Sequence, residues 1–187
     1  MRSLLRSLSV AFVASYIFLS AHPVRAGEVQ VMLGAAGGSS TWARDPTGYT
    51  SFKLGYRWAD VFAIHALTRL GYAPVNDRSL TYLSLGAQLW GRLGVTRPYV
   101  RVAASHQHEE SIASVTNELA GAVFGVGDGI RHRAGGEAAL GIDFPLRRDK
   151  RFQWVLSLEG STIYFPDPRG PSIYVLGGLA LGANYAL

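Results

Sequence analysis

Residues Tyr49–Trp58, "YTSFKLGYRW", alternate between apolar and polar side chains along most of their length. One parity holds the apolar side chains Phe52, Leu54, Tyr56 and Trp58. The other parity holds Ser51, Lys53, Gly55 and Arg57. Because successive residues of a strand point to opposite faces of a sheet, this stretch predicts a β-strand with one apolar and one polar face.

The same test, applied along the rest of the chain, finds the pattern again in "RAGGEAALGIDF", residues 133–144, and predicts eight strands in all. Their approximate ranges are 28–37, 49–58, 61–72, 79–91, 98–108, 131–144, 152–164 and 172–187. Each range has about ten residues or more, and ten strand residues tilted near 40° rise about 25 Å, the height of the apolar band of an outer-membrane barrel. After residue 26 no run of apolar residues is long enough to predict a transmembrane helix.

The connections between the predicted strands alternate in character. Those after the second, fourth and sixth strands are compact: "AD", "LGVTR" and "PLRRDKR". Those after the first, third, fifth and seventh are longer or more varied: "GSSTWARDPTG", "APVNDR", residues 109–130 and "FPDPRGP". Short turns at one end and longer loops at the other, with both termini at the short-turn end, are typical of even-stranded outer-membrane barrels. The predicted fold class is therefore all-β, an eight-stranded antiparallel up-and-down transmembrane β-barrel.

A soluble, lipocalin-like eight-stranded barrel is the alternative, and it would place its apolar face inside. The polar face of this chain is rich in small residues that suit a narrow interior, among them Gly34, Ser51, Gly55, Ala63, Ser84, Gly86, Ala103, Ser105, Gly135, Gly141, Ser157, Gly178 and Gly182. The opposite face is almost uncharged and carries Leu83, Leu85, Leu89, Leu156, Leu158, Leu179 and Leu181. This distribution favours the membrane barrel over the soluble one.

The aromatic residues support the same placement. Seven map near the short-turn end on the apolar face: Tyr56, Trp58, Phe62, Phe144, Phe152, Trp154 and Tyr185. Clustering at one height predicts an aromatic girdle at a lipid–water boundary. Tyr72 and Tyr164 are expected to form a thinner girdle at the other end.

The first residues predict export. Arg2 and Arg6 precede an apolar run that is too short to span a bilayer, and Val24-Arg25-Ala26 follows it, as expected of a cleavable signal peptide at 1–26 ahead of a barrel domain at 27–187. Cleavage after Ala21 and an uncleaved anchor helix are the alternatives. The chain has no cysteine and therefore no lipoprotein signal or disulfide framework. The whole chain carries 18 basic and 13 acidic side chains; without Arg2, Arg6 and Arg25 it carries 15 against 13, net +2, which argues against a nucleic-acid partner.

The chain ends in the alternating stretch "GGLALGANYAL", residues 177–187. Gly182, Tyr185 and Leu187 resemble the C-terminal signal by which the barrel-assembly machinery recognises outer-membrane proteins, although the last residue of that signal is more often Phe or Trp. The whole layout resembles the small OmpA/OmpX-type barrels. The resemblance implies a place in the bacterial outer membrane, with outer-membrane lipids and lipopolysaccharide as surroundings and the barrel-assembly machinery as a partner through the last strand.

By parity, a set of polar side chains points into the barrel: Glu28, Lys53, Arg57, His65, Arg69, Gln88, Arg101, Arg133, Glu137, Asp143, Gln153, Glu159 and Asn184. Buried charges need partners, so we expect Arg57 to pair with Glu28 and Arg101 with Asp143. Lys53 or Arg133 is expected to meet Glu137 and Glu159. Since an eight-stranded barrel has room only for its own side chains, this network predicts a plug, with a narrow ion or proton path as the alternative.

Two further stretches are candidates for function. Residues 109–130 have apolar residues at helix-like spacing and are expected to form a short amphipathic helix that meets an unknown partner, the membrane or the barrel mouth. In "SHQHEE", residues 105–110, His106 and His108 share a face, and His132 on the neighbouring strand is expected near them. They suggest a metal site, and Ser105 with His106 and Glu109 suggests a lipid A-modifying enzyme.

Polar side chains that point outward are ordinary at the headgroup boundary, so the histidines alone do not predict a metal site. The residues Ser105, His106 and Glu109 match no recognisable enzyme signature. The sequence therefore predicts no catalytic residue, no cofactor and no metal. The predicted function is that of a non-enzymatic outer-membrane barrel with a role in envelope structure or surface contact through its loops. A narrow conduit for ions or small solutes is the second hypothesis, and a lipid A-modifying enzyme is the third.

Overall fold

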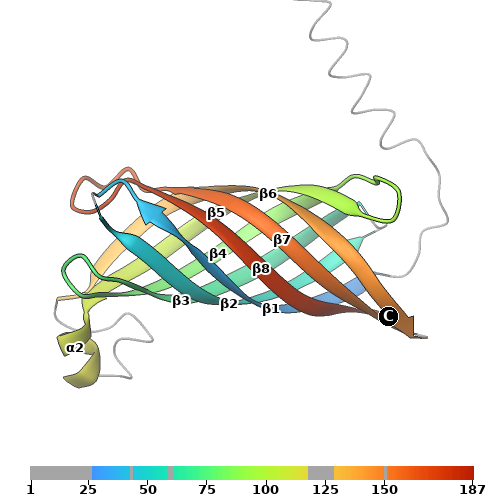
Figure 1. Ribbon diagram of the computed structural model, residues 1–187, viewed down its shortest axis with the longest axis horizontal. Coiled ribbons are helices and arrows are strands. Elements are labelled where there is room, and N and C mark those ends of the chain that lie inside the picture. The colour runs from blue at the N-terminus through green and yellow to red at the C-terminus, as the bar shows by residue number, and fades with distance from the viewer. Residues whose placement is uncertain (1–26, 43, 59–60, 118–128, 150) are drawn as a thin grey trace, which may run out of the picture.

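The computed structural model describes residues 27–42, 44–58, 61–117, 129–149 and 151–187, so the predicted signal peptide lies outside the described residues. Eight antiparallel strands close into one barrel (Figure 1). Their bounds are β1 Glu28–Ser40, β2 Pro46–Trp58, β3 Phe62–Ala73, β4 Arg78–Trp90, β5 Arg97–Ser111, β6 Arg131–Asp149, β7 Phe152–Tyr164 and β8 Ile173–Ala186. Within the described residues, a short helix, α2, spans Ile112–Asn117.

Each strand pairs with the next one in the chain, and β8 pairs with β1 to close the sheet. At the closing seam Glu28 lies opposite Ala186 on one side and opposite Arg57 of β2 on the other. Closure leaves no sheet edge with unpaired backbone groups. A sheet in a medium without water has to be closed in this way, because water cannot satisfy those groups. The predicted fold class is confirmed.

Apolar side chains cover the outside of the barrel, as the strand alternation requires. Leu33, Leu85 and Leu140 expose 65%, 63% and 67% of their surface, whereas the charged side chains on the opposite face are buried. A soluble barrel would show the reverse distribution, so the lipocalin-like alternative is wrong. The outer surface instead matches a hydrocarbon environment.

The strands are longer than predicted at the end away from the termini. β1 and β2 extend to Ser40 and from Pro46, and β5 continues to Ser111, because their alternation carries on through residues expected to be loops. At the other end β6 continues to Asp149 through a register shift between Pro145 and Arg148. Proline lacks the ladder donor, and a bulge at this point lets the strand resume pairing after it.

The two ends of the barrel differ (Figure 1). The C-terminal end of β8 lies at the right of the view, whereas α2 lies at the left, beyond the ends of β4 and β5. The backbone N–H of Ile112 donates to the carbonyl of Asp77 at 2.9 Å and fixes the start of α2 against the β3–β4 turn. In the described part of the chain no helix is long and apolar enough to cross a membrane.

The predicted contrast in connection length holds only in part. Residues 112–130 and 165–172 separate strands at the α2 end, but the turn at 74–77 is shorter than the turn at 91–96 at the other end. In the latter, Leu93 and Thr96 exchange backbone hydrogen bonds at 3.0 Å, and Gly94 has a φ of 59°, a conformation that glycine adopts without strain.

Both predicted aromatic girdles face outward. Near the terminal end, the Trp58 ring lies 4.5 Å from Tyr56 and 5.7 Å from Phe62, measured between ring centroids. Phe152 and Tyr185 are 4.9 Å apart in the same way. At the α2 end, Tyr72 and Tyr164 are exposed on the outer face. Amphipathic rings at two heights fit the two interfaces of a bilayer.

Candidate functional site: the filled lumen and its outer mouth

The lumen is filled by side chains in successive tiers, and the tier nearest the termini centres on Arg57. Its guanidinium forms an ion pair with Glu28 and lies over the ring of Trp90, 5.5 Å from the centroid. The Trp90 indole N–H donates to Asp143 Oδ2 at 2.8 Å. The predicted pair between Arg57 and Glu28 is confirmed, because the two residues are register neighbours on β2 and β1.

The middle tier joins two carboxylates and two guanidinium groups. Arg101 binds Glu137 with two hydrogen bonds of 2.8 and 3.0 Å and also donates to Glu159 at 3.1 Å. Arg69 lies 2.8 Å from Glu137 and 3.3 Å from Glu159. Bidentate contacts of this kind hold both side chains in one geometry, so the tier braces β3, β5, β6 and β7 against one another.

Two tyrosines complete the middle tier. The hydroxyl of Tyr82 donates to Glu137 at 2.7 Å, and that of Tyr99 donates to Glu159 at 2.8 Å. Each carboxylate therefore accepts hydrogen bonds from an aromatic hydroxyl as well as from arginine, which offsets the cost of burying its charge.

The predicted partners of this tier were partly wrong. Arg101 pairs with Glu137 and Glu159 and not with Asp143, because the register places Arg97 opposite Asp143 and Arg101 opposite Ala139. Arg133 reaches neither Glu137 nor Glu159 in the described contacts but binds Glu109. The Lys53 ammonium lies 3.5 Å from the Gln88 amide oxygen and 5.6 Å from the centroid of the Tyr99 ring.

A small cavity of about 40 Å³ lies beside the middle tier. Its lining includes Lys53, Arg69, Ser51, Ser157 and Glu159. Its volume corresponds to about three or four water molecules, since a single water needs roughly 10–15 Å³ on the same measure.

Toward the α2 end, a cluster of apolar and aromatic side chains, here called the collar, packs inside the lumen. It consists of buried, mutually packed side chains that come from β2, β3, β4, β7, the residue after β7, and β8: Tyr49, Leu67, Ala73, Leu80, Tyr82, Ile163, Phe165, Tyr174 and Leu176. The rings of Phe165 and Tyr174 meet edge to face at 6.0 Å between centroids. The collar fills this part of the lumen with mutually packed side chains.

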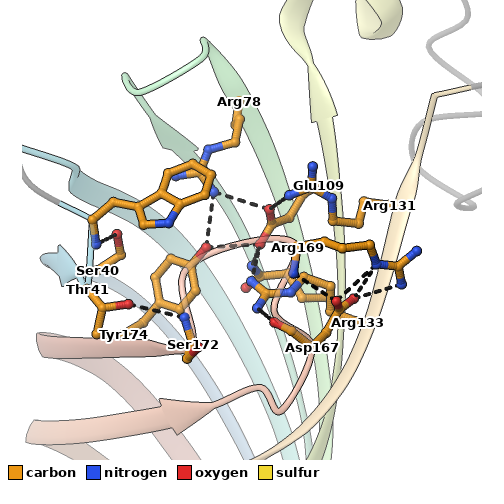
Figure 2. A network of polar contacts seen from close by, with 12 residues as sticks. Ser40, Thr41, Arg78, Glu109, Arg131, Arg133, Asp167, Arg169, Ser172 and Tyr174 are labelled. Atoms are coloured by element: carbon orange, nitrogen blue, oxygen red, sulfur yellow. Dashed lines mark hydrogen bonds and ion pairs between the residues drawn. The ribbon is translucent and has the colours of Figure 1, made fainter.

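At the outer mouth, Glu109 stands at the centre of a second ionic network (Figure 2). Its carboxylate lies 2.7 Å from Arg133, 3.2 Å from Arg78 and 3.5 Å from Arg131. It also accepts hydrogen bonds from the Tyr174 hydroxyl at 2.9 Å and the Gln107 amide at 2.8 Å. One carboxylate thus ties β4, β5, β6 and β8 together.

The sequence pattern does not predict this network, because it places Glu109 in the loop 109–130 and Arg78 in a turn. The signal that would have found them is parity: Glu109 continues the inward series of Arg101, Ser105 and Gln107 along β5. Because β5 runs three residues past its expected end at 108, Glu109 is a luminal side chain and not a loop one.

The outer loops are fixed to the same network (Figure 2). Arg78 also pairs with Asp45 and lies over the Trp42 ring at 4.6 Å, while Arg133 donates to the Asp167 carbonyl at 3.0 Å. The Arg169 guanidinium hydrogen-bonds to the Asp167 carboxylate and holds the pKa of that carboxyl well below its ordinary value. The ion pair therefore favours the charged form of Asp167.

The three residues suggested for catalysis do not form a triad. Ser105 and Glu109 are buried and point into the lumen, whereas His106 lies at the opposite parity on the outer face of β5. Activation of a serine requires a base within hydrogen-bond reach and an acid that orients it. Here Glu109 is bound by Arg78 and Arg133. His106 and the Ser105 hydroxyl lie on opposite faces of β5.

His106, His108 and His132 do come together on the outer face, as expected from their positions. Nε2 of His106 lies 3.3 Å from Nδ1 of His132, and the ring centroids of His108 and His132 are 4.7 Å apart. One ring nitrogen from each of the three histidines lies within 4.8 Å of the other two, so three side chains that can bind a metal converge here.

No family model matches the chain, and no curated protein matches it in sequence. Its fold matches solved structures at low identity. Neisserial surface protein A aligns with a TM-score of 0.56 and 17% identity over 89% of this chain and 100% of that one. The N-terminal β-barrel domain of Pseudomonas aeruginosa OprF gives 0.52 and 17% over 87% and 99%. Ail, the attachment invasion locus protein of Yersinia pestis, gives 0.51 and 14% over 87% and 99%.

These neighbours are small eight-stranded outer-membrane barrels, and the chain shares their closed fold over nearly their whole length. With the apolar outer surface, the likeness defines the class of this protein: a small β-barrel of the bacterial outer membrane. At these identities the comparisons establish the fold, and the role has to be argued from the lumen and the loops.

Proposed function

We propose that this protein is a closed, non-enzymatic barrel that anchors a rigid outer surface in the outer membrane and acts through that surface. The observation that carries the proposal is the filled lumen. Two ionic tiers, an apolar collar and the network around Glu109 occupy it from the terminal end to the mouth. The barrel wall therefore serves as a support, and the exposed outer ends of the strands are the part that meets other molecules.

The outer surface is well suited to contact. The network around Glu109 fixes Trp42 and the β7–β8 loop to the barrel, and Asp77 fixes the start of α2. Loops that are already ordered lose less entropy on binding. The name of the Yersinia pestis neighbour, attachment invasion locus protein, supports a surface role of this kind. The partner, recognition of the last strand by the assembly machinery, and cleavage of residues 1–26 all remain predictions.

Conductance tests the proposal. The protein, extracted in detergent from membranes and reconstituted in planar lipid bilayers, is expected to give no steady ohmic current. A variant with a depleted collar, Phe165→Ala with Tyr174→Ala, is the matched positive control, because it removes two large rings from the lumen and is expected to conduct. Steady ohmic steps from the unmodified protein would contradict the proposal and would favour the narrow conduit.

A separate experiment tests the surface role. Replacing residues 112–128 with a short Gly-Ser linker removes α2 and leaves the described strands, so the barrel is expected to fold and stay in the membrane. Cells that carry this variant are expected to adhere less to host-cell or abiotic surfaces than cells with the unmodified protein. Unchanged adhesion would restrict the role to envelope structure.

A further inference from the structure

Three histidines meet on the lipid-facing side of the barrel wall near its outer end. His106 and His108 lie on β5 at outward parity, and His132 is the second residue of β6. The register places His108 directly opposite His132, while His106 lies opposite Ala134. Residues directly opposite in an antiparallel pair have Cβ atoms about 4.5–5.5 Å apart, so the sheet itself holds the rings together.

The spacing of the ring nitrogens fits a metal ion. One nitrogen from each of the three rings lies within 4.8 Å of the others, and the His106 and His132 nitrogens are 3.3 Å apart. Zinc–nitrogen bonds of about 2.0–2.1 Å at a tetrahedral angle place two ligand nitrogens roughly 3.3 Å apart. The His108 nitrogen, within 4.8 Å of the other two, supplies the third member of the set.

His108 supplies an independent observation. Its side chain is only 7% exposed, although it points outward, and its Nδ1 is buried with no hydrogen-bond partner among the described residues. A buried polar atom without a partner is costly, and such atoms in a native protein often mark an ion or water that completes them. A metal ion bound at this nitrogen would satisfy it.

The surroundings do not oppose a cation. On the outer face, the in-register neighbours of His106 are Leu83 and Ala134, and those of His108 are Thr81 and His132. None of these side chains carries a fixed positive charge. The basic side chains nearby, Arg131 and Arg133, sit at the inward parity of β6 and bind Glu109.

We propose that His106, His108 and His132 form a binding site for a divalent first-row transition metal, of the class of zinc, copper or nickel. Imidazole nitrogens suit these ions, whereas calcium and magnesium require oxygen ligands. Three protein ligands leave a fourth position for water or for a group from another molecule. His132 is exposed and is the second residue of β6, so the site lies at the outer end of the wall, where an ion reaches it from the water side.

Calorimetry with zinc chloride tests the site. The protein is expressed as the full chain without a polyhistidine tag, extracted from membranes in detergent and stripped with a chelator. We expect one zinc ion to bind per chain. The variant with His106→Ala and His132→Ala is expected to bind at least about tenfold more weakly, since loss of even an outer-shell partner typically costs roughly 10–100-fold. Both residues are at least partly exposed, so circular dichroism should show an unchanged barrel.

His65→Ala is the matched control, because His65 is buried inside the lumen, away from the outer face, and its loss should leave zinc binding unchanged. Cobalt provides a second readout, since a bound tetrahedral cobalt ion absorbs visible light strongly and the double variant should lose that band. The absence of saturable zinc binding, or equal binding by the double variant, would overturn the proposal. Reduced binding in His65→Ala alone would place the ion elsewhere and would overturn it as well.

Discussion

At the scale of single residues, the lumen depends on carboxylates that each serve several cations. Glu137 contacts Arg69, Arg101 and Tyr82 while its own side chain is fully buried. The net worth of such a buried pair against an apolar replacement is small, but removal of one partner leaves uncompensated charge. Glu137 is therefore the position at which a single change should disturb the lumen most.

Glu137→Ala is expected to lower the free energy of unfolding by about 3–5 kcal/mol, because it leaves Arg69 and Arg101 short of a counter-charge. Urea unfolding in lipid vesicles, followed by tryptophan fluorescence, measures the loss. Asp149→Ala is the control, since Asp149 pairs with Arg147 at the exposed end of β6 and its loss should cost less than about 1 kcal/mol. Equal losses in the two variants would contradict the account.

Residue parity could be predicted from the sequence, but the choice of partners could not. The period of two assigns Arg101 and Asp143 to the same face. The pair of Arg57 with Glu28 was predicted from their positions on adjacent strands, which the register confirms. It does not give the offset between β5 and β6 or the reach of a guanidinium across a narrow lumen to β7. Arg101 therefore has partners that no local pattern names.

At the scale of elements, glycines on the inner face make room for aromatic rings of neighbouring strands. Gly141 of β6 lies under Tyr99 of β5, and a Cβ built at Gly141 would stand 2.3 Å from Cζ of that ring. The ring in turn bonds to Ser157 and Glu159 of β7. The absence of a side chain at Gly141 thus allows Tyr99 to bridge the three strands.

Gly141→Val is expected to destabilise the barrel by about 1–3 kcal/mol through overpacking of the lumen. Gly160→Val is the matched control on the neighbouring strand, because it faces outward and its nearest contact is a backbone oxygen at 4.0 Å. Unfolding in lipid vesicles should show a lower midpoint for the first variant and an unchanged or higher one for the second. A lower midpoint for Gly160→Val alone would be inconsistent with the assigned faces.

The existence of the eight strands could be predicted, whereas their ends could not. Alternation is a continuous signal, and Pro145 interrupts it without ending β6, because the bulge restores pairing at Arg148. Likewise, the loop expected at 109–130 begins only after Ser111. The expected amphipathic helix is present in part as α2, and residues 118–128 lie outside the described part of the chain.

At the scale of the whole molecule, the protein reverses the usual distribution of polarity. Charged groups are buried along the axis, and leucines cover the outside. The hydrophobic effect cannot favour this arrangement in water, because it would leave apolar surface hydrated. The fold is therefore stable only where hydrocarbon covers the outer surface.

An arginine placed on the outer apolar surface should destabilise the barrel, because its charge would lie in hydrocarbon. Leu140→Arg is expected to lower the free energy of unfolding by up to about 2–4 kcal/mol, as found near a bilayer midplane. Val95→Arg, in the β4–β5 turn where Val95 is 87% exposed, should change it by less than about 1 kcal/mol. Equilibrium unfolding from vesicles measures both variants. Equal tolerance of arginine at the two positions would show that Leu140 does not face lipid.

The most direct measurement is the accessibility of spin labels in the reconstituted protein. The chain has no cysteine, so single substitutions at Leu33, Leu85 and Leu140 give unique attachment sites, with Val95 as the control in the turn. Labels at the three leucines are predicted to collide readily with oxygen, which partitions into lipid, and hardly at all with a water-soluble nickel chelate, while Val95 shows the opposite. Ready access of the nickel chelate to all three leucine positions would contradict the membrane barrel.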